Sequence, residues 1–222
     1  MCKIFSGIIT KSGVLFDLDT DSHEDIIKKH KLNDKTKSPD FVRVELTPKD
    51  GNIFNHNPEN WELETDQDGD LIPSWYSEKL AEKEMRQALK QLIKERFIIN
   101  NDSWEQREGQ RIFVIKSKVK AIRCKVVAWG NSSVVAWGNS SVVAWGNSSV
   151  VAWGNSSVVA RENSSVEAWG NSSVEAWGNS SVVAWGNSSV VAYDLASIKD
   201  IKNKKIIVAN KDMKLEQFEV QK

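Results

Sequence analysis

The sequence predicts a mainly β protein in which a parallel β-solenoid follows a small α+β domain. An eight-residue unit, Val-x-Ala-Trp-Gly-Asn-Ser-Ser, repeats in tandem through residues 126–197. Such a short period is typical of closed, stacked coils. The residues before it contain short strand-like segments and one long helical pattern. We therefore predict an α+β domain over 1–111, a solenoid over 112–210 and a C-terminal cap or tail over 211–222.

The first elements predicted are a hairpin and a short helix. Two apolar runs, Cys2–Thr10 and Val14–Leu18, flank a Lys-Ser-Gly turn, which is the pattern of a β-hairpin. Ser22, with Asp25 three residues later, forms a capping box, a common start of helices. We expect this helix over His23–Lys31.

Two further strands and a long helix complete the predicted α+β domain. Alternating residues of Phe41–Leu46 and the segment Trp61–Thr65 indicate strands. Pro73 precedes a helical pattern over Ser77–Arg96, whose apolar residues recur at intervals of three and four. The stripe expected to be buried consists of Leu80, Ala81, Met85, Ala88, Leu89, Leu92 and Ile93. The strand order cannot be derived from this pattern.

Variation among the repeats indicates which side chains point inward. The first position is always Val and the third always Ala, whereas the second admits Glu167 and Glu175 and the fourth admits Arg161 and Tyr193. Because side chains alternate between the faces of a strand, Val and Ala should point inward and the other two positions outward. Gly, Asn and Ser suit the turn, since Gly tolerates positive φ and Asn and Ser bond local backbone.

The length of the repeat favours two repeats per coil. Eight extended residues span roughly 26 Å, which is too short for a closed turn around a core. A coil of two repeats is the smallest workable unit. A coil of three repeats is the alternative, but Val and Ala are small for the centre of a triangular prism. We expect the asparagines of successive turns to form a hydrogen-bonded ladder.

Two repeats per coil would place the fourth-position side chains in two rows. Side chains in successive coils should lie about 4.8 Å apart, close enough for rings to stack and for Arg161 to lie between two tryptophans. One row is Trp129, Trp145, Arg161, Trp177 and Tyr193, and the other is Trp137, Trp153, Trp169 and Trp185.

The segments on either side of the array should close its ends, because an open sheet edge invites further pairing. Ile112–Ile115 and Val119–Lys125 resemble imperfect coils, and Cys124 shares the parity of the inward residues. Lys199–Lys205 and Leu215–Val220 are expected to cap the far end.

Two segments carry a resemblance to a known group of proteins. The opening MCKIFSGIITKSGVLFD and the VVAWGNSS repeats, which together make up roughly half of the chain, resemble uncharacterised bacterial and bacteriophage octapeptide-repeat proteins. These place a short N-terminal domain ahead of a β-solenoid. The resemblance implies the fold and implies no activity.

Charge and cysteine content bear on partners and compartment. The 30 basic and 30 acidic residues give zero formal net charge, so nucleic acid is not an expected partner. No segment has the length and apolarity of a signal peptide or a membrane helix. Cys2 and Cys124 are expected to be reduced thiols, which indicates a cytoplasmic protein of a bacterium or a phage-infected cell.

Candidates for catalysis and metal binding are weak. Cys2 would become an N-terminal nucleophile if Met1 were removed, as in N-terminal-nucleophile hydrolases, but a strand-start cysteine is the simpler interpretation. The acidic turn Asp66–Asp70 begins like a calcium loop and lacks its later ligands. The histidines lack companion ligands at metal spacing, so we expect solvated or capping side chains at His23, His30 and His56. No cofactor or metal is predicted.

The exposed tryptophans motivate the functional hypothesis. A contiguous apolar patch of several aromatic rings is unusual on a monomer. We expect a structural or interaction protein that forms a homodimer through Trp137, Trp153, Trp169 and Trp185. The row with Trp129, Trp145, Arg161 and Trp177 should face solvent or the rim. Binding of sugars or bases to the stacked rings is the alternative, and hydrolysis through Cys2 is a further one.

Overall fold

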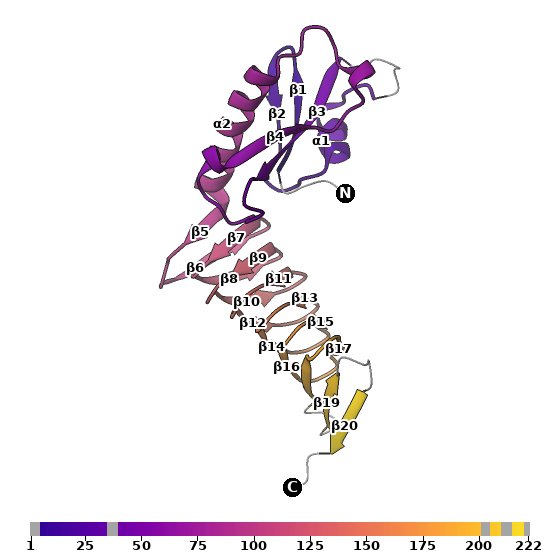
Figure 1. Cartoon of the computed structure of the whole chain (residues 1–222). Helices are drawn as coiled ribbons and strands as arrows, with labels where there is room; N and C mark the ends of the chain where they lie inside the picture. The colour runs from indigo at the N-terminus through magenta and orange to yellow at the C-terminus, as the bar shows by residue number, and fades with distance from the viewer. Residues whose placement is uncertain (1–4, 35–39, 201–204, 210–214, 220–222) are drawn as a thin grey trace. The chain divides into compact units, whose positions relative to one another are not determined.

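The computed structural model describes residues 5–34, 40–200, 205–209 and 215–219. The chain divides into two compact units, residues 1–96 and 97–222, and each is described by itself. Figure 1 shows the helices and the antiparallel sheet of the first unit and the stacked strands of the second.

The first unit contains a four-stranded antiparallel sheet with the order β2-β1-β3-β4. Its strands are β1 (Phe5–Thr10), β2 (Gly13–Leu15), β3 (Phe41–Pro48) and β4 (Trp61–Thr65). The predicted hairpin is confirmed, with Thr10 opposite Gly13. Short 3-10 helices, η1 (Pro58–Asn60) and η2 (Gly69–Leu71), precede and follow β4.

Two helices cover opposite faces of this sheet. Helix α1 (His23–His30) begins at the predicted cap, where the Ser22 hydroxyl accepts a hydrogen bond from the backbone N–H of Asp25. Its Ile26 packs in one cluster with Ile8 of β1. Neighbouring Gly7 faces the other way, where a Cβ would meet the Met85 sulfur of α2 (Glu78–Arg96) at 2.5 Å. Because successive strand residues point to opposite faces, the sheet lies between the helices (Figure 1).

Two residues of the predicted apolar stripe of the long helix are not buried, namely Leu80 and half-buried Ile93. Leu80 is 61% exposed. Along the helix surface, Leu80 shares its row with Glu84, Gln87 and Gln91, which are polar, so it lies beside the buried stripe. The side chains that are buried are Ala81, Met85, Ala88, Leu89 and Leu92.

The second unit is the predicted parallel β-solenoid. Strands sixteen residues apart pair in register, so Val134 lies beside Val150 and Val142 beside Val158. Each coil therefore uses two repeats, one in each of two sheets. The regular strands are β9 (Lys125–Trp129), β10 (Ser133–Trp137), β11 (Ser141–Ala144), β12 (Ser149–Ala152), β13 (Ser157–Ala160), β14 (Ser165–Ala168), β15 (Ser173–Ala176), β16 (Ser181–Ala184), β17 (Ser189–Ala192) and β18 (Ser197–Asp200).

The solenoid core is narrow and made of small side chains. The first and third residues of the repeats from Val126 to Ala184 are buried, and with Cys124 most of them form one cluster. The second-position residues are half-buried or, as at Glu167 and Glu175, exposed. This confirms the predicted inward and outward positions.

Both predicted boundaries of the solenoid require correction. Parallel pairing begins with β5 (Phe97–Ile99) and β6 (Trp104–Glu108), before residue 112. These strands join the coils of β7 (Arg111–Ile115) and β8 (Lys118–Ile122). At the other end, β19 (Lys205–Ala209) and β20 (Leu215–Glu219) pair antiparallel after β18, so the last parallel strand ends at Asp200.

The turns are fixed by glycine and by one serine of each repeat. Gly146 has φ near +71°, and a Cβ there would lie 3.1 Å from the backbone nitrogen of Gly130 in the preceding coil. The Ser148 hydroxyl donates to the carbonyl of Trp145, 2.7 Å away, within its own turn. The equivalent serines of the repeats before Ser188, which is half-buried, are buried: Ser132, Ser140, Ser148, Ser156, Ser164, Ser172 and Ser180.

Asparagines and two acidic residues link successive turns. The amide of Asn155 donates to Asn139, and that of Asn171 donates to Asn155, as expected of a ladder. Glu162 and Asp194 occupy the glycine position with positive φ. Their carboxylates accept hydrogen bonds from glycine N–H groups sixteen residues earlier, which helps to stabilise this conformation.

Candidate functional site

The predicted interface side chains lie in two rows along the solenoid. The tryptophan row, defined as Trp137, Trp153, Trp169 and Trp185, follows strands of the nine-stranded sheet. The rings of Trp153 and Trp169 stack with centroids 4.9 Å apart, and those of Trp169 and Trp185 with centroids 4.6 Å apart. Ring contact holds this part of the row together. Among the described residues, no hydrogen-bond acceptor reaches the buried indole N–H groups of Trp169 and Trp185.

The tryptophan row is most exposed at its N-terminal end. Trp137 and Trp153 are 43% and 42% exposed, whereas Trp169 and Trp185 are half-buried. Among the ring contacts of the described residues, the stack consists of Trp153, Trp169 and Trp185 and does not include Trp137. Two large rings therefore present apolar surface side by side on neighbouring strands β10 and β12.

The second row, which we call the mixed row, is organised around a cation. The Arg161 guanidinium lies 4.9 Å from the ring centroid of Trp145 and 5.7 Å from that of Trp177, as predicted. Trp177 stacks on Tyr193 with centroids 3.9 Å apart. Trp129, the first residue of this row, is half-buried. The members of this row cover one another's ring faces, so less ring surface is accessible to a partner.

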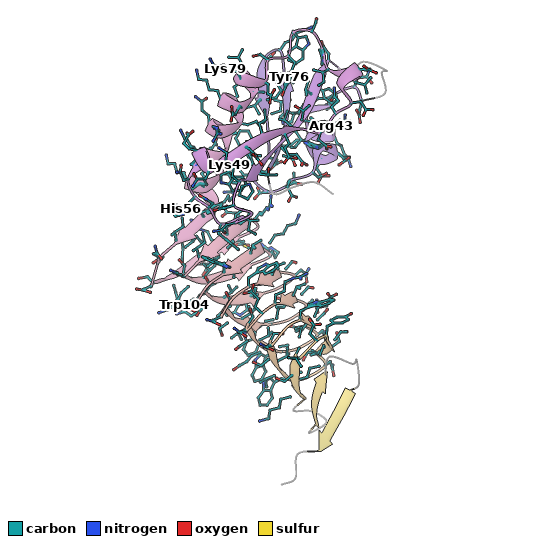
Figure 2. The ribbon with its side chains drawn as sticks, in the orientation of Figure 1. Arg43, Lys49, His56, Tyr76, Lys79 and Trp104 are labelled. Carbon is teal, nitrogen blue, oxygen red and sulfur yellow. The ribbon has the colours of Figure 1, made fainter. Side chains whose placement is uncertain are left out.

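Beside the tryptophan row runs a column of second-position side chains. It reads Lys120, Val135, Val151, Glu167, Val183 and Lys199 along successive strands of the nine-stranded sheet. Lys120 and Glu167 are exposed, and the valines between them are half-buried. This part of the nine-stranded sheet thus combines exposed rings with aliphatic groups, and the charged side chains of its column are Lys120, Glu167 and Lys199. Figure 2 shows the side chains of both units, with Trp104 at the start of the solenoid.

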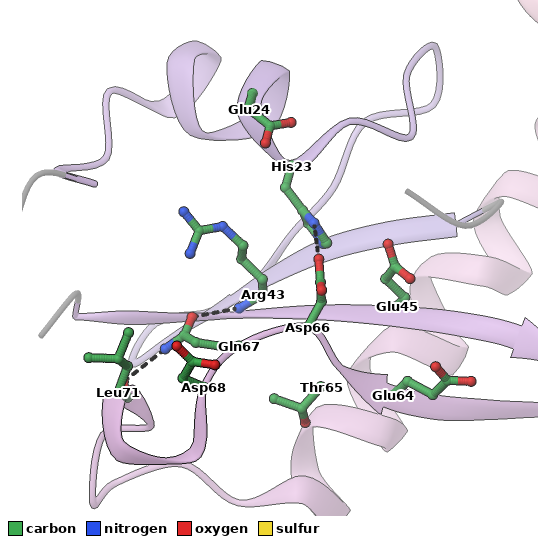
Figure 3. Close-up of a pocket in the computed structure, with 10 residues that line it drawn as sticks. All are labelled: His23, Glu24, Arg43, Glu45, Glu64, Thr65, Asp66, Gln67, Asp68 and Leu71. Atoms are coloured by element: carbon green, nitrogen blue, oxygen red, sulfur yellow. Dashed lines mark hydrogen bonds and ion pairs between the residues drawn. The ribbon is translucent and has the colours of Figure 1, made fainter. Parts of the chain in front are cut away.

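A second candidate site lies in the first unit and was not predicted. It is a cavity of about 710 Å³ between α1, β3 and the segment that follows β4 (Figure 3). Helix α1 packs over Ile8, and the polar residues Arg43 and Glu45 of the same sheet line the cavity. The acidic lining residues are Glu24, Glu45, Glu64, Asp66 and Asp68, and the basic one is Arg43.

His23 is at the back of this cavity, and the expectation of a solvated or capping histidine is wrong for it. The side chain is buried, with 1% exposure. Its Nε2 lies 3.0 Å from the carbonyl oxygen of Val44, and its Nδ1 lies 3.3 Å from the Asp66 carboxylate. Glu45 is also buried, at 5% exposure, and one donor atom from each of His23, Glu45 and Asp66 lies within 4.8 Å of the others.

The sequence contained one signal for this cluster. Glu45 stands in an otherwise largely apolar strand, and an acidic residue in the middle of a sheet is rarely buried without a reason. The three residues come from α1, β3 and the end of β4, so no spacing rule joins them. His30 and His56 are exposed, as expected, and Asp66–Asp70 forms a turn that leads into η2.

The cysteines and charges add little further chemistry. Cys124 is a free, buried thiol in the solenoid core, as predicted from its parity. Cys2 lies outside the described residues, so its predicted role remains untested. At Glu24, its own backbone N–H and the Ser22 hydroxyl hydrogen-bond the carboxylate and lower its pKa, so this rim of the cavity is ionised at neutral pH.

Comparison with protein-family models, with curated proteins and with solved structures finds no match for this chain. Within the described ranges, no helix has both the length and the apolarity needed to cross a membrane.

Proposed function

We propose that the protein is a structural or interaction protein that forms a homodimer through the tryptophan row. The observation that carries this proposal is the exposure of Trp137 and Trp153 on adjacent strands, next to half-buried Val135 and Val151. Adjacent exposed aromatic and aliphatic side chains are typical of the centre of protein–protein interfaces.

The charges on the same sheet favour a second copy of the chain as the partner. A twofold axis parallel to the strands and between β10 and β12 would place Trp137 over the partner's Trp153. The same rotation would place Lys120 opposite the partner's Glu167. Lys120 lies in β8 and Glu167 in β14, and these two strands flank β10 and β12 symmetrically. A twofold contact is self-complementary and closed, so it forms a dimer rather than a fibre.

The expected affinity is moderate. At the observed exposure each of the two tryptophans leaves about 100 Å² accessible. Four such rings in a dimer would bury about 400 Å², which at about 25 cal/mol per Å² contributes roughly 10 kcal/mol. Association opposes this by about 4–15 kcal/mol. The two terms are of similar size even after the valines and the two ion pairs are added, so we expect a reversible dimer.

Charge reversal tests this arrangement of the two chains in the dimer. Lys120→Glu or Glu167→Lys alone should place like charges opposite each other twice per dimer and weaken dimerisation about tenfold or more in analytical ultracentrifugation. The double variant should return to within about threefold of the native constant. Glu175→Lys, at the equivalent position of the other sheet, is the matched control and should leave the dimer unchanged.

Removal of the rings tests the surface itself. Trp153→Lys combined with Trp169→Lys should give a folded monomer with native circular dichroism. If the native mass persists in this variant, pairing lies elsewhere. If the native chain is itself a monomer at high concentration, the proposal fails, and binding of sugars or bases to the rings becomes the better hypothesis.

We further propose that the chain belongs with the octapeptide-repeat proteins of bacteria and bacteriophages, and that it is cytoplasmic. The regular repeat supports the first statement, and the unbridged Cys124 supports a reducing compartment.

A further inference from the structure

The cavity of the first unit contains a nitrogen donor and two carboxylates in ligand-like positions. Nδ1 of His23 and Oδ2 of Asp66 are 3.3 Å apart. Two ligands of a tetrahedral zinc ion, each bonded at about 2.0 Å, are separated by about 3.3 Å. The buried Glu45 carboxylate lies within 4.8 Å of both and completes the set.

The orientation of His23 leaves Nδ1 for a ligand. The Val44 carbonyl can only accept a hydrogen bond, so Nε2 must carry a proton to donate to it across 3.0 Å. Histidines that bind metals commonly donate their second ring N–H to a backbone carbonyl in this way, which fixes the tautomer and the ring orientation. In the neutral ring, the Nδ1 lone pair then faces the Asp66 carboxylate, and a proton or a metal cation must lie between them.

The charge of the cavity suits a cation, because acidic side chains line it, those of Asp66 and buried Glu45 among them. The basic lining residue, Arg43, forms an ion pair with Asp34, and its guanidinium lies over the Phe41 ring, 5.3 Å from the centroid. A divalent ion between the carboxylates of Asp66 and Glu45 would balance them and would add a cationic partner for buried Glu45, to which the Ser6 hydroxyl donates across 3.5 Å.

We propose that His23, Glu45 and Asp66 bind a divalent transition-metal ion such as Zn²⁺, with Nδ1 of His23 as the nitrogen ligand. Imidazole suits Zn²⁺ and its neighbours in the first transition series, whereas sites for Ca²⁺ and Mg²⁺ are built from oxygen ligands. Three protein ligands leave one tetrahedral position, where water or a small anion from the cavity can bind.

Calorimetric titration of the full chain with Zn²⁺ tests the proposal. We expect one ion per chain at this site, and at least tenfold weaker binding in Asp66→Asn. The Asp66 side chain is 58% exposed, so this variant should fold. Asp68→Asn is the matched control, because Asp68 lines the same cavity outside the ligand set and should retain native affinity within about twofold. A chain lacking the exposed histidines, with His30→Ala and His56→Ala, removes surface binding.

Three outcomes would overturn the proposal. One is the absence of Zn²⁺ binding at millimolar concentration, and another is equal affinity in Asp66→Asn and Asp68→Asn. The third is tighter binding of Ca²⁺ than of Zn²⁺. Co²⁺ provides an independent readout, since visible absorption of a tetrahedral complex should appear in the native chain and be lost in Asp66→Asn. Neither experiment depends on dimerisation.

Discussion

Placing a carboxylate inside the solenoid should be far more destabilising than placing one outside. Ala144 has 0% exposure and lies between Ala128 and Ala160 in the ladder of one sheet. Val143, its neighbour, points outward and is half-buried. Two coils further along the column of Val143, Glu175 already occupies the equivalent position. The pair Ala144→Asp and Val143→Glu therefore compares the two faces of one strand.

The magnitude follows from the ionisation of aspartate. A buried, unpaired carboxyl group would be protonated, and protonating it at pH 7 costs about 4 kcal/mol, at 1.36 kcal/mol for each of about three pH units. Extra atoms between two closely packed sheets cost a further 1–3 kcal/mol, roughly. We expect Ala144→Asp to lower the free energy of unfolding by about 5–7 kcal/mol, and Val143→Glu to lower it by less than about 1 kcal/mol.

Urea denaturation followed by circular dichroism and tryptophan fluorescence measures both variants. The folded-state pKa of the introduced Asp is raised above its unfolded value, so its ionisation penalty is full at neutral pH. This penalty should disappear as the pH falls toward 4, and only the packing term should remain. Equal destabilisation by the two substitutions at pH 7, or no recovery of Ala144→Asp in acid, would refute the assignment of the inward face.

Two further predictions concern the turns and the N-terminus. Ser148→Ala should destabilise the chain by about 1–2 kcal/mol, because the hydroxyl is buried and bonds the carbonyls of Trp145 and Gly130. Ser149 is exposed, so Ser149→Ala is the control and should be nearly neutral in the same denaturation assay. If hydrolysis through Cys2 is correct, mass spectrometry must find the initiator methionine removed, and the thiol must react with small electrophiles faster than free cysteine; a retained methionine excludes that mechanism.

Regular repetition made most of the solenoid predictable. Nine copies of one pattern show which positions tolerate charge, and that tolerance alone indicated that Val126 and Ala128 point inward. The first coil was missed because β6 contributes no buried side chain, so Trp104–Glu108 has no apolar alternation to detect. Only the tertiary pairing of β6 with β8 reveals it.

The cluster of His23, Glu45 and Asp66 could not be predicted, for a different reason. Its three members come from separate elements, and their proximity depends on a strand order that the sequence pattern does not specify. In the tryptophan row, the stacking of Trp153 on Trp169 follows from the coil length and could be predicted. The greater exposure of Trp137 and Trp153 than of the other two rings could be found only from the structure.

The two-repeat coil has a consequence for how such a gene can change length. Unequal recombination between the nearly identical gene segments that encode the octapeptides can remove any number of copies. Loss of two copies deletes one layer, shortens the stack by about 4.8 Å and keeps every downstream strand on its own side. Loss of a single copy moves every following strand into the opposite sheet. The hairpin β19–β20 would then have to pair in the seven-stranded sheet, which now ends at β17. Viable length variants of this protein should therefore differ by even numbers of repeats.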